Sequence, residues 1–190
     1  MKAHLPAAKT SSDTLQPDDQ GAHPLTLIFE SRPQRAALDE IIIREALCNP
    51  ILVLDAGNCF NPLQLTQKIR KQTQEVIETL ERIQVARAFT CFQVVTLLEE
   101  TRDPKGPVFI LRLLTTFVDE MIPVYERLRL LKQVDGHIER LRTSAAVRVM
   151  IRNSHFQDEP LTAWFSNLHA RADAILYPEI DLQPEPATLF

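Results

Sequence analysis

Residues 49–100, NPILVLDAGNCFNPLQLTQKIRKQTQEVIETLERIQVARAFTCFQVVTLLEE, contain the pattern that decides the fold. The continuous apolar run at 51–54 ends at Asp55 and a Gly-Asn turn, which is typical of a buried strand. Pro62 begins a helical pattern, residues 83–86 form a second short strand pattern, and another helical pattern follows. This alternation predicts an α/β domain with a mostly parallel sheet flanked by helices.

Two blocks in this stretch resemble the core of the RecA/Rad51 recombinase-like ATPase family. The first is Leu54-Asp55 followed by the Phe60-x-Pro62 helix start, and the second, more specific block is V-A-R-A-F at 85–89. In that family an acid-containing strand end precedes a Phe-x-Pro helix start, and a V-A-R-A-[FY] strand end follows about one helix later. The resemblance covers residues 25–179 and implies a RecA-like core.

Length and composition indicate one domain with a sizeable core, because the chain has 190 residues of which 45% are hydrophobic. Residues 1–24 mix polar residues, proline and alanine without a period, so we expect a disordered leader there. The RecA-like domain is then expected at 25–180, with a strand at 25–29 and a helix at 35–48, and a flexible tail at 181–190.

Charge and cysteine content limit the partners, sites and cellular compartment to be expected. The formal net charge of -4 gives no global field that would attract nucleic acid, so any DNA contact must be local. The three cysteines form no CxxC motif, and the histidines have no ligand spacing with them, which argues against a disulfide framework and a metal site. No signal-peptide pattern or membrane-length apolar run is present, so a cytoplasmic protein without membrane contact is expected.

The first part of the resembled family's nucleotide site that this sequence lacks is the phosphate loop. That loop, G-x-x-x-x-G-K-[ST], wraps phosphates with backbone N–H groups and supplies a lysine and a magnesium-binding hydroxyl. The corresponding residues 30–37 are ESRPQRAA, so both glycines, the lysine and the hydroxyl are absent. Glu30 would place a negative charge beside a polyphosphate.

This sequence also differs from the family's pattern at three further parts of the ATPase site. Gly57 stands where a catalytic glutamate would activate water, and Arg112 stands where the strand at 107–114 would end in a magnesium-organising aspartate. After the strand at 145–151, only Asn153 remains of an Asn-Gln pair. The resemblance therefore implies a pseudo-ATPase with no catalytic residue and no cofactor, and a degenerate nucleotide site at Glu30, Arg35, Ala36, Ala37, Asp55, Arg112 and Asn153.

A long helix or helix pair is expected over residues 119–142, broken near Asp135-Gly136. Its apolar residues recur at three- and four-residue steps and should pack against the sheet: Met121, Val124, Tyr125, Leu128, Leu131, Val134, Ile138 and Leu141. A second amphipathic helix at 161–171 and a strand at 174–177 extend the sheet.

The same region is locally basic. Recombinase-like folds place loops near this strand's end against DNA, so the candidate DNA-contact residues are Arg127, Arg129, Lys132, Arg140, Arg142, Arg148 and Arg152. The alternative is a solvated helix face with salt bridges to neighbouring acids.

The end of the chain supplies one more candidate. Thr188, Leu189 and Phe190 resemble the end of the short peptide by which bacterial DNA polymerases bind the sliding clamp, although Pro186 and Ala187 depart from its first positions. A frayed terminus is the alternative.

The resemblance implies a non-catalytic RecA-like accessory or regulatory protein that assists DNA recombination, repair or damage-tolerant synthesis. Its expected partner is a RecA-type ATPase, a polymerase or the sliding clamp, with DNA reached through that partner. Two alternatives stay open: an ATP-binding or weakly hydrolysing protein that uses Arg32, Arg35, Asp55 and Asn153, and a pseudo-ATPase regulatory module outside DNA metabolism.

Overall fold

A computed structural model describes residues 22–30, 35–152 and 159–177. Six strands form one sheet in the order β3-β2-β4-β5-β1-β6, and every pairing is parallel. The strands are β1 (Leu25–Glu30), β2 (Ile51–Asp55), β3 (Ile83–Arg87), β4 (Val108–Leu111), β5 (Val147–Arg152) and β6 (Ala174–Leu176). All strands therefore end at one edge of the sheet, which we name the carboxyl edge.

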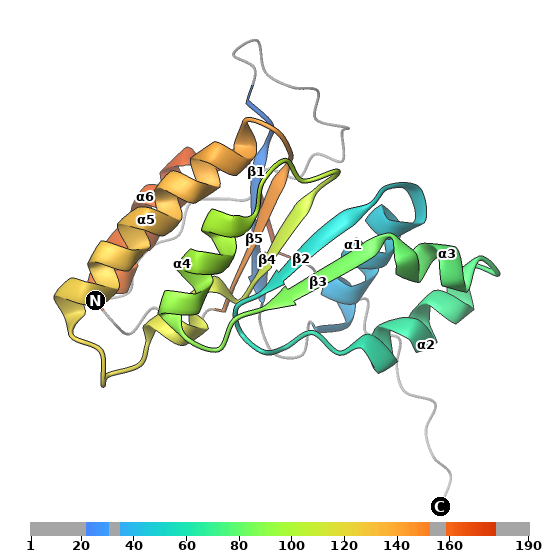
Figure 1. The fold of residues 1–190 in the computed structure, drawn as a ribbon, viewed down its shortest axis with the longest axis horizontal. Helices are drawn as coiled ribbons and strands as arrows, with labels where there is room; N and C mark the ends of the chain where they lie inside the picture. The colour runs from blue at the N-terminus through green and yellow to red at the C-terminus, as the bar shows by residue number, and fades with distance from the viewer. Residues whose placement is uncertain (1–21, 31–34, 153–158, 178–190) are drawn as a thin grey trace, which may run out of the picture.

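Helices cover both faces of the sheet (Figure 1). One face, named the α1 face, packs against α1 (Arg35–Cys48), α2 (Pro62–Gln72) and α3 (Val76–Glu81). The opposite face, named the α5 face, packs against α4 (Cys91–Glu100), α5 (Val124–Arg142) and α6 (Glu159–Arg171). The predicted α/β class, with a parallel sheet flanked by helices, is thus confirmed.

The central strands owe their continuous apolar sequences to this two-sided cover. Every residue of β1 and β4 is buried. Successive side chains along a strand pack into two separate cores, one on each face of the sheet. In β2, Leu52 and Leu54 belong to the core under α5, whereas Ile51 and Val53 belong to the core under α1. No helix within the described residues is long and apolar enough to span a bilayer.

Two helices begin with side-chain caps at the carboxyl edge. The Asn61 side chain accepts hydrogen bonds from the N–H groups of Leu63 and Gln64, and Pro62 occupies the first helical position of α2. Thr90 caps α4 by accepting from the N–H of Gln93. Each cap satisfies N–H groups that have no partner within the helix, so these two residues fix where the helices start.

The strand predicted at 107–114 is shorter than expected. It ends at Leu111, because Arg112 adopts the left-handed conformation (φ 49°), and a short 3-10 helix, η1 (Leu113–Phe117), follows. The sequence pattern missed this turn since the apolar residues continue without interruption into η1, where Leu113, Leu114 and Phe117 are buried.

The predicted break near Asp135-Gly136 is wrong. α5 begins only at Val124, after Pro123, and continues through Gly136 to Arg142. A glycine inside a helix costs about 1 kcal/mol relative to alanine, which the burial of Leu131, Val134 and Ile138 around it outweighs.

The apolar stripe expected over residues 121–141 is only half buried. Leu131, Val134, Ile138 and Leu141 are fully buried, whereas Met121 and Tyr125 are 89% and 74% exposed, and Val124 and Leu128 are also exposed. The 19 residues of α5 span about 28 Å, and the six residues of the neighbouring β5 span only about 20 Å. The first turns of α5 therefore extend past the carboxyl edge.

Candidate functional site

The carboxyl edge holds two arginine–carboxylate pairs on the α1 face. Glu30 ends β1, Asp55 ends β2 and Arg87 ends β3, while Arg112 directly follows β4. The residue before Glu30 and the residues on both sides of Asp55 and Arg87 belong to the core under α5, so alternation turns the three strand-end side chains toward α1. The pairs are Glu30 with Arg112 and Asp55 with Arg87.

Arg112 binds Glu30 through two parallel hydrogen bonds. Its Nε donates to Oε2 of Glu30 at 2.5 Å, and its Nη2 donates to Oε1. The hydrogen bonds with Glu30 raise the pKa of Arg112 above its usual value. β5 lies between β4 and β1 in the sheet, so these two strands are not neighbours. The pair passes the carboxyl end of β5 and connects the segment after β4 to β1. Such a bidentate pair fixes geometry as well as charge.

Asp55 is completely buried, and it accepts hydrogen bonds from two backbone N–H groups and from Arg87. Its Oδ1 accepts from the N–H of Cys59 at 2.9 Å, and its Oδ2 accepts from the N–H of Phe60 and from Nε of Arg87, both at 3.0 Å. Arg87 also donates to the carbonyl oxygen of Phe60 at 2.9 Å. The carboxylate therefore stabilises the turn between β2 and α2.

The thiol of Cys59 lies among these charges. Its pKa is raised to about 12, chiefly by burial and then by the charge of Asp55, while Arg112 acts in the opposite direction. Glu30 also contributes to the increase. A thiol with this pKa stays protonated at neutral pH and is a poor nucleophile, so Cys59 is not a reactive cysteine.

Gly57 and Arg112 depend on each other sterically. A Cβ atom added at Gly57 would lie 2.4 Å from Cβ of Arg112 and 3.1 Å from its Cδ. The resemblance aligns residue 57 with a catalytic glutamate. With the backbone as it stands, a side chain at residue 57 would collide with the Cβ atom of residue 112, so this turn favours glycine at residue 57.

The structure thus brings together Glu30, Asp55 and Arg112 of the predicted degenerate nucleotide site. Arg35, Ala36 and Ala37 form the first turn of α1, but their side chains lie outside the described residues, as does Asn153. Sequence reasoning missed Cys59 and Arg87 as members of the cluster. The available sequence signal for the arginine was its position at the end of the strand pattern that follows the one ending at Asp55, and the structure pairs the two residues in register.

The charges at this edge neutralise one another. Each of the two carboxylates has its own arginine, and the oxygens of Asp55 also accept backbone N–H groups. Within the part of the chain that the structure describes, no three His, Cys, Asp or Glu side chains are grouped to hold a metal ion. The described residues of the cluster are arranged as a structural brace.

All four candidate DNA-contact arginines on α5 have partners within the protein. Arg127 is buried and donates to the carbonyl oxygen of Phe117, and Arg129 pairs with Glu126 on the next turn. Arg140 donates to the carbonyl oxygens at the end of α4, and Arg142 pairs with Asp173 and Glu139. Lys132 is exposed on α5.

The other two candidates belong to the opposite face of the sheet. Arg148 of β5 pairs with Glu45 of α1 at 2.5 Å and lies 5.1 Å from the ring centroid of Phe109. Arg152 is half-buried at the end of β5. Like Arg148, it alternates with β5 residues that belong to the core under α5, so it is on the α1 face. The seven residues therefore do not form one surface, and direct DNA contact stays a prediction. The tail candidates, Thr188, Leu189 and Phe190, lie outside the described residues.

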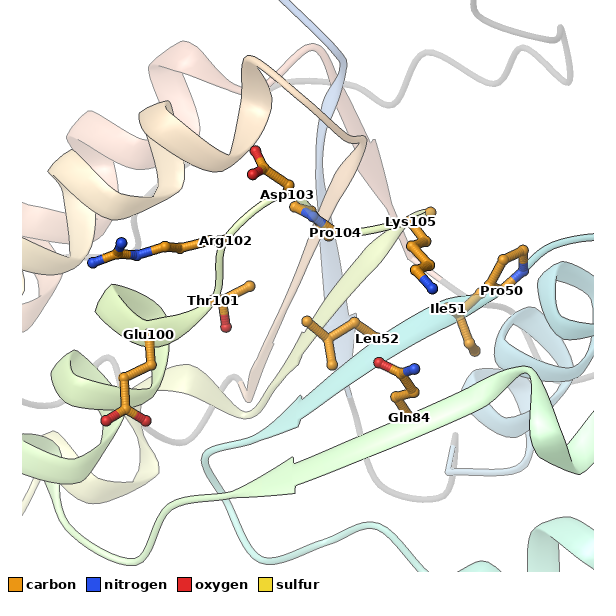
Figure 2. Close-up of a pocket in the computed structure, with 11 residues that line it drawn as sticks. Pro50, Ile51, Leu52, Gln84, Glu100, Thr101, Arg102, Asp103, Pro104 and Lys105 are labelled. Atoms are coloured by element: carbon orange, nitrogen blue, oxygen red, sulfur yellow. The ribbon is translucent and has the colours of Figure 1, made fainter.

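Two pockets open at opposite edges of the sheet. One, of about 270 Å³, lies where β2 and β3 begin and contains side chains of both charge signs, including Glu100, Arg102, Asp103 and Lys105. Figure 2 shows Lys105 above β2 and Arg102 directed away from that strand. The other, of about 350 Å³, lies at the carboxyl edge between Gly57, Phe89 and Asp119.

No protein-family model matches the sequence, and no curated protein is significantly similar to it.

Proposed function

We propose that this protein is a non-catalytic RecA-like accessory or regulatory protein that assists DNA recombination, repair or damage-tolerant synthesis through contacts with other proteins. The resemblance of residues 54–62 and 85–89 to the recombinase-like ATPases supplies the setting. The observed parallel sheet, with helices on both faces, is consistent with a RecA-like core without being specific to it.

The observation that best supports a non-catalytic role is the pair formed by Glu30 and Arg112. These residues occupy the positions that the resemblance assigns to the start of the phosphate loop and to the magnesium-organising acid. In this protein they bind each other, and the arginine supplies the positive charge at the place where the family organises a metal ion. ATP hydrolysis needs phosphate cradle, magnesium ligand and water-activating base together, so a site lacking all three is expected to be inactive.

Calorimetric titration of the full chain with magnesium and ATP tests the non-catalytic part. We expect no heat of binding at millimolar nucleotide and no release of phosphate. Binding that depends on magnesium and falls in Arg35→Glu would instead support the ATP-binding alternative.

Affinity capture tests the DNA-metabolism part. The tagged protein, captured from its own cells at native expression after nuclease treatment, should retain a RecA-type ATPase, an error-prone polymerase or the sliding clamp. Loss of that partner on truncation of Thr188, Leu189 and Phe190 would assign the contact to the tail. Recovery of signalling or division proteins alone would overturn the DNA-metabolism setting and favour a regulatory pseudo-ATPase.

A further inference from the structure

The pocket at the carboxyl edge is separate from the ion-pair cluster, although both lie at the same edge. It includes Ala56 and Ala88, which belong to the core under α5, so it opens on the α5 face while Glu30, Asp55 and Arg87 are on the α1 face. Its walls come from the segment after β2, the segment between β3 and α4, η1 itself and the segment that joins η1 to α5. Of the described residues of the degenerate nucleotide site, Glu30, Asp55 and Arg112 do not line it, whereas Gly57, which the resemblance aligns with a catalytic glutamate, does.

Two threonine hydroxyl groups in this pocket have unused hydrogen-bonding capacity. Thr115 and Thr116 both line the pocket, and the Oγ1 atom of each is buried without a hydrogen-bond partner. Oγ1 of Thr115 faces Gly57, since it would lie 3.2 Å from a Cβ atom placed there. Buried hydroxyls are normally hydrogen-bonded, so an unpaired pair beside a cavity indicates a missing partner group.

The pocket has an acidic character. Asp119 is its one charged side chain among the described lining residues, and no base is among them. Burial raises the pKa of the nearby Cys91 thiol, and the charges of Asp119 and Glu126 raise it further, so carboxylates influence the start of α4. A phosphate group would meet repulsion from Asp119, whereas a cationic group would be attracted.

Exposed apolar side chains occur in the segments that contribute to this pocket. Phe89 lines the pocket and is 63% exposed, Val118 precedes Asp119, and Met121 follows it by two residues. Phe92 and Tyr125 lie in the first turns of α4 and α5, and we name these five exposed residues the rim. Aromatic residues and methionine are enriched in protein interfaces, and grouped exposed apolar side chains mark interaction sites.

We propose that this pocket and its rim bind a segment of a partner protein in which an arginine enters the pocket and neighbouring apolar side chains pack on the rim. The planar guanidinium has five N–H donors, which suits two threonine oxygens and a carboxylate better than the single point charge of lysine. The proposal rests on the proposed function only in requiring a protein partner. It adds a surface on the face of the sheet opposite the degenerate nucleotide site.

Titration of the ¹⁵N-labelled full chain with two blocked peptides tests this proposal. The first is acetyl-Leu-Arg-Phe-amide, and the second replaces arginine by citrulline, which has nearly the same shape without the charge. The arginine peptide should shift the amide signals of Asn58, Thr115, Thr116 and Ile122 and should bind about tenfold more tightly than the citrulline peptide, since charge-assisted hydrogen bonds are the stronger kind.

Three variants locate the effect. Asp119→Asn should bring the arginine peptide down to the affinity of the citrulline peptide, and the double change Thr115→Val and Thr116→Val should weaken the arginine peptide several-fold. Thr96→Val is the matched control, because that hydroxyl donates to the carbonyl oxygen of Phe92 on an exposed part of α4. Retained amide spectra confirm that each variant is folded.

Equal binding of the two peptides, absence of saturable shifts at millimolar peptide, or shifts elsewhere in the chain would overturn the proposal. Shifts of the same amides by a single-stranded oligonucleotide, or by protein concentration alone, would overturn it in favour of nucleic acid or a second copy. Its failure is distinct from failure of the proposed function. Affinity capture can recover a DNA-metabolism protein while the peptide does not bind, which would overturn only this proposal. Peptide binding without recovery of such a protein would overturn only the proposed function.

Discussion

Arg112 holds both carboxylate oxygens of Glu30 across the carboxyl end of β5, so a single side-chain pair connects the segment after β4 to the end of β1. Both side chains are largely buried. Removing one partner from a buried pair leaves an uncompensated charge, which costs more than the pair itself contributes.

Arg112→Gln should therefore lower the free energy of unfolding by about 3 kcal/mol, because the carboxylate of Glu30 stays buried without its partner. Urea denaturation followed by circular dichroism measures this loss. Adding Glu30→Gln should recover much of it, since no unpaired charge then remains. Arg129→Gln is the control, because the Arg129–Glu126 pair is exposed to solvent and its loss should be undetectable. A double variant as unstable as Arg112→Gln alone would contradict the role of the buried charge.

Gly57→Ala and Gly136→Ala should change stability in opposite directions. The first adds a Cβ atom 2.4 Å from Cβ of Arg112, so the backbone must shift, at a cost of about 1–3 kcal/mol. The second adds a methyl group inside α5 with no atom within 4 Å, and should stabilise by about 0.5–1 kcal/mol through helix propensity. Thermal denaturation of both variants checks the pair. An unchanged melting temperature for Gly57→Ala would show that Arg112 moves aside without cost.

The stability of the protein should decrease as the pH rises above about 9, partly because of Cys59. Its thiol has a pKa near 12 when folded, against 9.0 as the ordinary value, so between these limits the unfolded chain has lost the proton that the folded chain retains. The unfolded state then binds fewer protons, and the free energy of unfolding falls by about 1.4 kcal/mol per pH unit for this group. Denaturation between pH 8 and 11 should show a smaller decrease in Cys59→Ala than in the unchanged protein.

Alkylation gives an independent measure of the same thiol. At pH 8 iodoacetamide should modify the exposed Cys48 first and leave Cys59 unmodified until the protein unfolds. Peptide mass spectrometry separates the two sites. Rapid native modification of Cys59 would show that the thiol is neither buried nor protonated as described.

The two faces of the sheet separate the candidate DNA-contact residues into two groups. If α5 contacts DNA directly, Lys132→Glu should weaken binding of a single-stranded oligonucleotide and reduce the slope of affinity against salt by about one, because one phosphate contact would be lost. Arg148→Gln should leave this binding unchanged and lower stability, because Arg148 packs between Glu45 and the ring of Phe109. Fluorescence anisotropy at several salt concentrations distinguishes them. Weaker binding in Arg148→Gln with unchanged stability would place DNA on the α1 face instead.

Much of the fold could be predicted from local patterns. The helices after Asn61 and Thr90 begin where capping residues stand, and the strands at 25–30, 51–55 and 147–152 coincide with apolar runs. The end of β4 could not be predicted, because Arg112 leaves the strand through a left-handed turn amid uninterrupted apolar residues. The exposure of half of the apolar stripe could not be predicted either. Periodicity shows which face of a helix is apolar, but it does not show how much of that face the sheet covers.

The sequence by itself determined the α/β class, the parallel sheet and the absence of the phosphate-loop residues, because these depend on neighbouring residues and on period. Only the tertiary structure decided that Glu30 binds Arg112, 82 residues away, that Gly57 makes room for that arginine, and that the basic residues divide between two faces. Strand order sets which strand ends meet, and no local pattern records it, so pairings between distant residues emerge only when the sheet is assembled.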